Sequence, residues 1–287
     1  MLLGEYLSGW LAAYIEPCRA KSTVQGYRAA LRHLSEGARA ADLGDPGLAM
    51  ILQADIYTLA RKYSRQAQIL YAVLHCAMRR AVRMGYIVVS PMVRVDKPRH
   101  RGRAMRWLTV PQLARYLDAA ADSDLYVRLA LMAVCGLRRG EALAVEPGDV
   151  DAARELLMVR RQRQGAEVVP LKTECSRRDI PLRGGMLMLL LNRDDYGECS
   201  EATLAREHKR VLREAGLPSV TMHELRHTCA TTMIGAGVPM MVVQNYLGHS
   251  GYQVTADIYG HVAGDDLRAA AGVFDGIVGN YQQMMAL

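Results

Sequence analysis

Five short stretches of the sequence carry residue types that can do chemistry on an anionic group. In chain order they are Gly136-Leu137-Arg138, Leu171-Lys172-Thr173, His223-Glu224-Leu225-Arg226, Leu247-Gly248-His249 and Tyr259-Gly260-His261. Arginine binds anionic oxygens through fixed donor forks, histidine and lysine exchange protons, and tyrosine can attack as a nucleophile. Each residue by itself has an ordinary alternative: a helix cap, a solvated helix face, an exposed turn or simple packing. The presence of all five stretches in one chain calls for a single function that uses them together.

In order and spacing these stretches resemble the tyrosine recombinase (phage integrase) family, over almost the whole chain. The family has an arginine after Gly-Leu, a lysine in a β-hairpin, His-x-x-Arg, Leu-Gly-His, and then a tyrosine, here ten residues after the histidine. Each motif alone is weak, whereas all five in order in a basic chain are specific. The resemblance implies a catalytic set of Arg138, Lys172, His223, Arg226, His249 and Tyr259, supported by Glu141.

The chemistry that the resemblance implies suits these residue types. Arg138 and Arg226 would clamp the phosphate oxygens, whose charge grows in the transition state, while His249 would hydrogen-bond the phosphate. Tyrosine has a reference pKa of about 10, so Tyr259 needs a proton acceptor, for which the family points to His223. The lysine would protonate the leaving 5′ oxygen. Attack yields a 3′-phosphotyrosyl link that a second 5′-hydroxyl can reseal without ATP, so we expect no metal and no other cofactor.

A zinc protease is the competing enzyme hypothesis, because His223 to His227 also satisfies His-Glu-x-x-His. That motif needs a third ligand, and no glutamate follows Glu224 in the chain. The longer form needs glycine and histidine where this chain has Ala230 and Met233, and a permanent cation at Arg226 suits zinc poorly. We therefore interpret His227 as a structural neighbour and reject the zinc site.

Two further alternatives concern function within DNA biology. A non-catalytic DNA-binding regulator would explain the basic first third but not the spacing of Lys172 and Tyr259; a covalent protein–DNA adduct separates the two hypotheses. A chromosome-dimer-resolving recombinase of the same family is the other. The segment from Thr173 through Arg178 to Leu182 resembles integrases of phages and conjugative elements more, which favours integration and excision of a mobile element. No arm-binding domain is visible ahead of the first predicted helix.

Positive charge is concentrated in the first third of the chain. The formal net charge is +7, but residues 1–106 hold 17 Lys and Arg against 7 Asp and Glu, and residues 107–287 hold 19 against 22. A basic surface gains affinity for a polyanion by releasing counterions, although a charge run can also be a solvated linker. The candidate DNA contacts are Lys21, Thr23, Arg65, Arg99, Arg101 and Arg103.

Composition predicts a globular cytoplasmic protein. Half of the residues are hydrophobic and about a quarter are charged, and no apolar run reaches the roughly 18 residues that a membrane span needs. The beginning of the chain lacks the basic start of a secretion signal. The six cysteines are scattered without a Cys-x-x-Cys pair, which favours reduced thiols over disulfides or zinc.

The periodicity predicts a mainly α fold with a small antiparallel β-sheet. Helices are expected over Leu2–Ile15, from a Ser22 cap to Leu34, over Leu48–Arg61 and Ser64–Met84, from the Thr109–Gln112 capping box, and from Glu201 onward. Strands are expected over Leu156–Arg160, Glu167–Leu171 and Arg178–Leu182. By resemblance, 1–95 is a helical core-site DNA-binding domain, 96–106 a basic linker and 107–266 the catalytic domain.

The tail, residues 267–287, repeats apolar side chains at spacings of three and four from Leu267 to Met285. Its glycines weaken an isolated helix, so we expect it to need a docking surface. Packing on its own domain is one alternative; the resemblance favours docking on a neighbouring subunit. The expected partners are double-stranded DNA, further copies of the chain in a tetramer on paired recombination sites, and accessory DNA-bending or directionality proteins; no membrane is expected.

Overall fold

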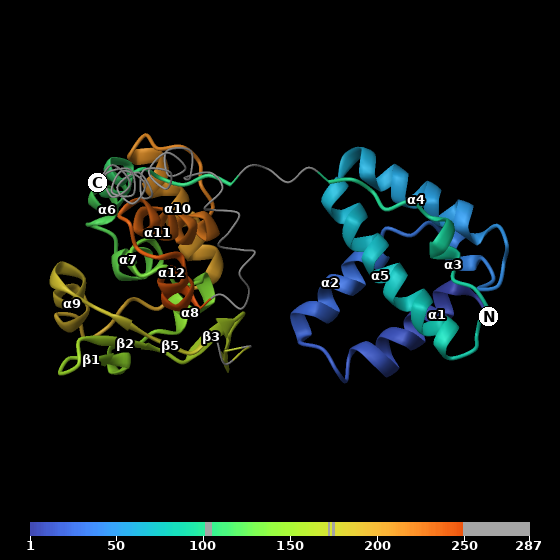
Figure 1. The fold of residues 1–287 in the computed structure, drawn as a ribbon, viewed down its shortest axis with the longest axis horizontal. Helices are drawn as coiled ribbons and strands as arrows, with labels where there is room; N and C mark the ends of the chain where they lie inside the picture. Colours follow the sequence, from blue (N-terminus) through green and yellow to red (C-terminus); the bar gives the residue numbers. More distant parts are fainter. Residues whose placement is uncertain (101–104, 172, 174–175, 249–287) are drawn as a thin grey trace, which may run out of the picture. The chain divides into compact units, whose positions relative to one another are not determined.

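The computed structural model describes residues 1–100, 105–171, 173 and 176–248. The chain divides into two compact units, Met1–Arg103 and Ala104–Leu287 (Figure 1), and each is considered by itself. The division falls inside the segment 96–106 that the sequence suggests as a linker. Among the described residues, no helix has both the length and the apolar character needed to cross a membrane.

The described secondary-structure elements of the first unit are all helices or helical turns, as its periodicity predicts. Its elements are α1 (Leu3–Trp10), the π-helical turn η1 (Leu11–Ile15), α2 (Lys21–Leu31), α3 (Glu36–Ala40), α4 (Leu48–Lys62), α5 (Ser64–Arg83) and the 3-10 turn η2 (Pro91–Arg94). The predicted Ser22 cap is wrong, because the N-cap residue is Ala20, two positions earlier, and α2 begins at Lys21. The short α3 was not predicted; Ser35 caps it by accepting a hydrogen bond from the Ala38 amide at 3.2 Å.

The core of the first unit is built around α5, which packs against α2 and α4. Leu70, Leu74 and Met78 on α5 are fully buried, and Leu52 and Ile56 of α4 meet them in the same apolar cluster. Side chains buried at intervals of three and four residues give each helix one apolar face. Burial of this face, rather than helix propensity, is what stabilises these helices.

The segment after η2 stays bound to the first unit. The Gln53 side chain accepts from the Asp96 amide at 2.6 Å, and the Gln68 amide donates to the Pro98 carbonyl at 3.1 Å. Ser64 Oγ and His100 Nδ1 lie 2.8 Å apart. Residues 96–100 therefore run along α4 and α5.

The second unit is mainly helical with small antiparallel sheets, which confirms the predicted fold class. Its helices are α6 (Val110–Ala120), α7 (Tyr126–Ala133), α8 (Arg139–Ala144), η3 (Pro147–Asp149), α9 (Gly184–Leu191), α10 (Glu201–Glu214), α11 (Met222–Gly235) and α12 (Met240–Leu247). The predicted Thr109–Gln112 capping box is present: Gln112 accepts from the Thr109 amide at 2.9 Å. Within this unit the strands lie on one side of the helices, with α8 on β3 and α12 on β5 (Figure 1).

The described strands form two sheets where the sequence suggests one. β1 (Val150–Asp151), β2 (Leu156–Val159) and β5 (Arg178–Pro181) make an antiparallel sheet in the order β1-β2-β5, while β3 (Arg161–Gln164) and β4 (Glu167–Pro170) form a hairpin. The predicted strands correspond to β2, β4 and β5. β1 is too short to show a pattern, and β3 reads Arg-Gln-Arg-Gln, with no apolar side chain to mark it.

Candidate active site

Arg138 and Glu141 meet at the start of α8. Arg138 is the N-cap residue, and its backbone amide donates to Glu141 Oε2 at 2.9 Å while its Nη1 donates to Oε1 at 2.6 Å. The arginine side chain keeps about a third of its surface exposed, whereas the carboxylate is buried. Glycine at 140 is required here, since a Cβ would lie 2.7 Å from the Arg163 carbonyl oxygen of β3.

Arg226 enters the same site from α11 and is almost completely buried. Its Nη1 donates to the Gly136 carbonyl at 2.7 Å and lies 4.0 Å from Glu141 Oε2. Gly136 has a φ of 62°, and a Cβ there would collide with Leu247 and lie 3.2 Å from Cys229 Sγ. The turn before Leu137-Arg138 needs a residue that has a left-handed backbone conformation and no side chain, and Gly136 meets both conditions.

Arg178 of β5 is a site residue that the sequence analysis missed. Its Nη2 donates to Glu141 Oε2 at 2.9 Å, its Nη1 to the Ser176 carbonyl at 3.1 Å, and its Nε to the Tyr246 carbonyl at 2.8 Å. An arginine at the start of a predicted strand looks solvent-exposed in sequence. Its tertiary partners on α8 and α12 are far away in the chain, so the segment around Arg178, although it resembles integrases, does not show what this side chain contacts.

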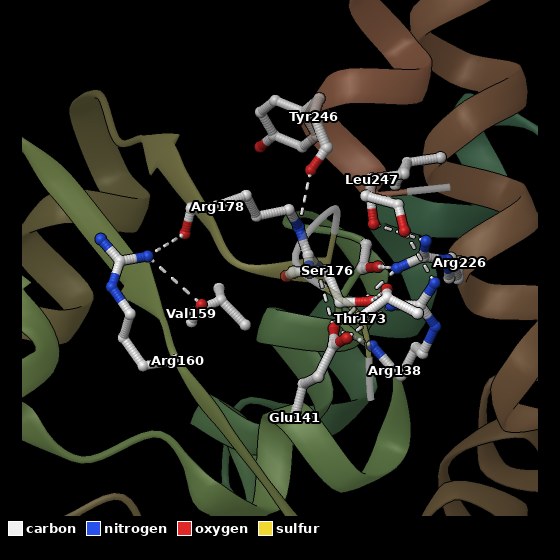
Figure 2. A network of polar contacts seen from close by, with 12 residues as sticks. Arg138, Glu141, Val159, Arg160, Thr173, Ser176, Arg178, Arg226, Tyr246 and Leu247 are labelled. Carbon is white, nitrogen blue, oxygen red and sulfur yellow. Dashed lines mark hydrogen bonds and ion pairs between the residues drawn. The ribbon is translucent and has the colours of Figure 1, made fainter. Parts of the chain in front are cut away.

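The end of α12 supplies acceptors to all three arginines (Figure 2). The carbonyl of Tyr246 accepts from Arg178, that of Leu247 from Arg226 at 2.5 Å, and that of Gly248 from Arg138 at 2.8 Å. The last carbonyls of a helix lack intrahelical partners and form the negative end of its dipole, so they suit cations. We refer to Arg138, Arg178, Arg226 and Glu141 as the arginine cluster.

Charges within the arginine cluster shift the pKa values of its members. Burial alone would raise the pKa of Glu141, but the hydrogen bond and charge of Arg178, together with the charge of Arg138, hold it below its usual value. Burial, reinforced by Arg138, lowers the pKa of Arg226 to about 9, so that it stays protonated at neutral pH. Three guanidiniums face one carboxylate, and the net positive charge suits an anion.

Two histidines lie one helical turn apart beside the cluster. The rings of His223 and His227, both on α11, are edge to face with centroids 4.8 Å apart. Burial and the charges of Arg226 and Arg138 lower the pKa of His223, so it is neutral at neutral pH and able to accept a proton. Burial, His223 and Arg226 lower the pKa of His227 to about 4. Thr221 caps this helix, with Glu224 accepting from the Thr221 amide at 2.6 Å.

The structure thus brings together Arg138, Glu141, His223 and Arg226 from the predicted set. Lys172, His249 and Tyr259 lie outside the described residues, as do Arg101 and Arg103. Lys21 and Thr23 are on the first turn of α2, Arg65 is exposed on α5, and Arg99 is exposed after η2, all in the first unit. The described residues contain no group of three or more His, Cys, Asp or Glu arranged to hold a metal ion.

Comparison with known proteins bears directly on this site. The sequence model of the phage integrase family matches residues 106–265, which is more than half of the chain and spans every predicted catalytic position. The chain belongs to the phage integrase family. It is therefore a tyrosine-type site-specific recombinase, as the order of its motifs predicts.

Relatives and solved structures agree with this membership. The chain is 28% identical over 280 residues to tyrosine recombinase XerC of Corynebacterium efficiens, covering 88% of this chain and 84% of that protein. It is 27% identical over 216 residues to tyrosine recombinase XerA of Saccharolobus solfataricus, covering 72% and 68%. The Tn1549 transposon integrase in complex with circular intermediate DNA has a similar fold, with a TM-score of 0.77, 18% identity and coverage of 96% of this chain and 100% of that one.

Proposed function

We propose that this recombinase cleaves and rejoins double-stranded DNA through a 3′-phosphotyrosyl intermediate, with the arginine cluster as its phosphate-binding site. The observation that carries the proposal is the convergence of Arg138 and Arg226 on Glu141. The carboxylate and the carbonyls at the end of α12 hold both guanidiniums in place before substrate arrives. Donors that are already oriented toward developing charge stabilise a transition state without reorganisation.

Proton transfers fall to the remaining residues of the motif set. His223, whose pKa is lowered, is neutral and can accept the proton of the attacking Tyr259. Lys172 would protonate the 5′ leaving oxygen, and His249, directly after Gly248, would hydrogen-bond the phosphate. The Tyr259 oxygen forms a bond to phosphorus as the 5′ oxygen leaves, and a 5′-hydroxyl reverses the step. The bond energy is conserved, so this scheme needs neither metal nor ATP.

The nucleophile is tested with Tyr259→Phe, which removes one oxygen and keeps the ring. The variant should bind target DNA normally and form no covalent adduct with a nicked suicide substrate on a denaturing gel. An adduct formed by the variant would exclude Tyr259 as nucleophile. Wild-type cleavage should persist in excess EDTA, because two guanidiniums do the work of a cation.

DNA binding would involve both units, the first contributing through its basic surface. Solved relatives include a lambda integrase tetramer bound to a Holliday junction, with a TM-score of 0.70. We propose that this chain likewise assembles as a tetramer on paired sites, with residues 1–95 binding the core site and 267–287 docking on a neighbouring subunit. A chain ending near Asp266 should still bind one half-site but lose cooperative binding to the full site. Unchanged cooperativity in gel shifts would contradict the docking.

The biological reaction is integration and excision of a mobile element, with chromosome-dimer resolution as the second candidate because the relatives include proteins named XerA and XerC. The covalent link offers a direct test. Genomic fragments trapped on the protein can be sequenced: element ends that flank the gene itself support integration, and a single distant chromosomal site supports dimer resolution. Accessory DNA-bending or directionality proteins would be seen as a requirement for host extract in one direction only.

A further inference from the structure

We infer that Arg178 is a positioning residue for recombination: it fixes the geometry of Arg138 and Arg226 through Glu141 and through the last turn of α12. The inference rests on the proposed role of those two arginines in binding the scissile phosphate. Arg178 belongs to none of the five motif stretches, and it comes from a strand that contributes no other residue to the arginine cluster.

The first link runs through the Glu141 carboxylate. Oε1 accepts from Arg138 Nη1 at 2.6 Å, while Arg178 Nη2 donates to Oε2 at 2.9 Å. Arg226 Nη1 lies farther off, 4.0 Å from the same Oε2 (Figure 2). A buried carboxylate must have its lone pairs satisfied. Arg178 shares Oε2 with the Arg138 backbone amide, which donates to it at 2.9 Å, and the two donors together hold the carboxylate in the rotation that meets the Arg138 side chain.

The second link runs through the end of α12. Arg178 Nε holds the Tyr246 carbonyl at 2.8 Å, and the next two carbonyls hold Arg226 and Arg138. The position of the last turn of α12 therefore sets where both phosphate-binding guanidiniums rest. Of the three arginines that hold this turn, Arg178 is the one to which the proposed function gives no role in binding the phosphate.

The protein already uses all three nitrogens of the Arg178 guanidinium: Nε, Nη1 and Nη2 each donate to a protein acceptor. Its side chain is 5% exposed, compared with 35% for Arg138 and 2% for Arg226, so it differs from Arg226 by its place outside the five motif stretches and not by burial. Its effect on catalysis must therefore pass through its neighbours. The planar fork reaches Glu141 on α8, the Ser176 carbonyl and the Tyr246 carbonyl on α12 at once, which a single ammonium on a lysine stem cannot do.

The experiment compares DNA with a methylphosphonate at the scissile position and ordinary DNA, using wild type and Arg178→Lys. Replacing one phosphate oxygen by methyl removes negative charge, so cleavage depends less on correctly placed guanidiniums. On ordinary DNA, Arg178→Lys should lower the cleavage rate by about tenfold to a hundredfold. On the methylphosphonate this penalty should shrink to about threefold or less. An equal penalty on both substrates would overturn the inference, because a general structural defect does not distinguish them.

Arg128→Lys is the matched control. Arg128 is also buried, and it also makes three hydrogen bonds, to the carbonyls of Gly197, Ala142 and Val145, but none to the arginine cluster. Any loss of rate in this variant should be equal on the two substrates, and its thermal unfolding shows how much a buried arginine contributes to stability alone. If Arg128→Lys also lost less rate on the methylphosphonate than on ordinary DNA, the substrate difference would not be specific to the arginine cluster and would not support the inference.

Two further variants separate this inference from the proposed function. Arg138→Ala should show the same smaller penalty on the methylphosphonate; if it does not, the phosphate-binding proposal fails and the inference fails with it. Glu141→Gln keeps the shape of the side chain but removes the charge that Arg178 orients. It replaces Arg178→Lys in the comparison of the two DNA substrates if Arg178→Lys does not fold. The double variant Arg178→Lys with Glu141→Gln should lose clearly less cleavage rate than the product of the losses in the two single variants. If the two losses multiply, Arg178 does not act through Glu141.

Discussion

The two units of the chain handle charge in opposite ways. In the first unit the described core is apolar, and the described arginines and lysines lie at the surface. In the second, the described polar and charged side chains that are buried include Arg128, Glu141, Arg178 and Arg226, and none of the buried charged residues in the described part of the chain belongs to the first unit. Burying charge costs free energy unless every group is paired.

That difference suits the roles proposed for the two units. The surface arginines of the first unit can attract DNA at little cost to its stability, because its fold depends on apolar packing. The second unit keeps guanidiniums partly desolvated beside a carboxylate, where their interactions with an anion are stronger than in water. Its site therefore depends on partners that must all be present together.

The largest expected effect comes from removing the shared carboxylate. Glu141→Ala leaves buried guanidiniums without their counter-ion and should lower the free energy of unfolding by about 3–5 kcal/mol. The matched change in the first unit is Glu16→Ala, which breaks the exposed ion pair with Arg28 at 2.5 Å and should cost about 1 kcal/mol or less. Urea unfolding of both variants measures the contrast; equal losses would contradict the comparison.

Acid should destabilise the second unit selectively. Burial depresses the pKa of His227 to about 4, so between pH 6.5 and 4 the unfolded chain binds protons that the folded chain does not. Stability should fall as pH drops through this window, by on the order of 3 kcal/mol for this residue, and His227→Phe should remove that part of the dependence. Trp10 lies in the first unit and Trp107 in the second, so Trp10→Phe and Trp107→Phe backgrounds report the units separately by fluorescence.

Packing around α8 should tolerate almost no added volume. Gly140→Ala pushes a Cβ against the Arg163 carbonyl oxygen and should destabilise the second unit by about 1–3 kcal/mol. At Gly148 an added Cβ meets nothing within 4 Å, so Gly148→Ala is the control and should be nearly neutral. If the two variants unfold at the same temperature, the tight contact between α8 and β3 is not important for stability.

The smallest effect on stability is expected at the surface of the first unit. Arg65→Ala should change the free energy of unfolding by no more than about 0.5 kcal/mol, because the side chain is exposed. It should nevertheless reduce by about 1 the slope with which log affinity for DNA falls with log salt. Arg154→Ala, exposed on the second unit, is the control. Equal slopes for wild type and Arg65→Ala would remove Arg65 from the DNA contacts.

The sequence by itself determined the helical first unit and the mixed second unit, and it predicted the four residues of the motif set that meet at the candidate site. Helices such as α4 and α5 follow from apolar spacing, and the capping box of α6 follows from Thr109 and Gln112, because these signals are local in the chain. The family motifs identified Arg138, Glu141, His223 and Arg226 through residue type and order. Strands β1 and β3 were not predicted from the sequence, because β1 is two residues long and β3 is polar throughout.

Only the tertiary structure decided how these residues are held. Arg178 looks like any strand arginine until β5, α8 and α12 converge, and the carbonyls of residues 246–248 become acceptors only because α12 ends against three guanidiniums. The need for glycine at 136 and 140 likewise comes from contacts with Leu247 and with β3. Propensity and periodicity describe neighbours in sequence, whereas burial and pairing of charge depend on groups that the chain brings together across tens of residues.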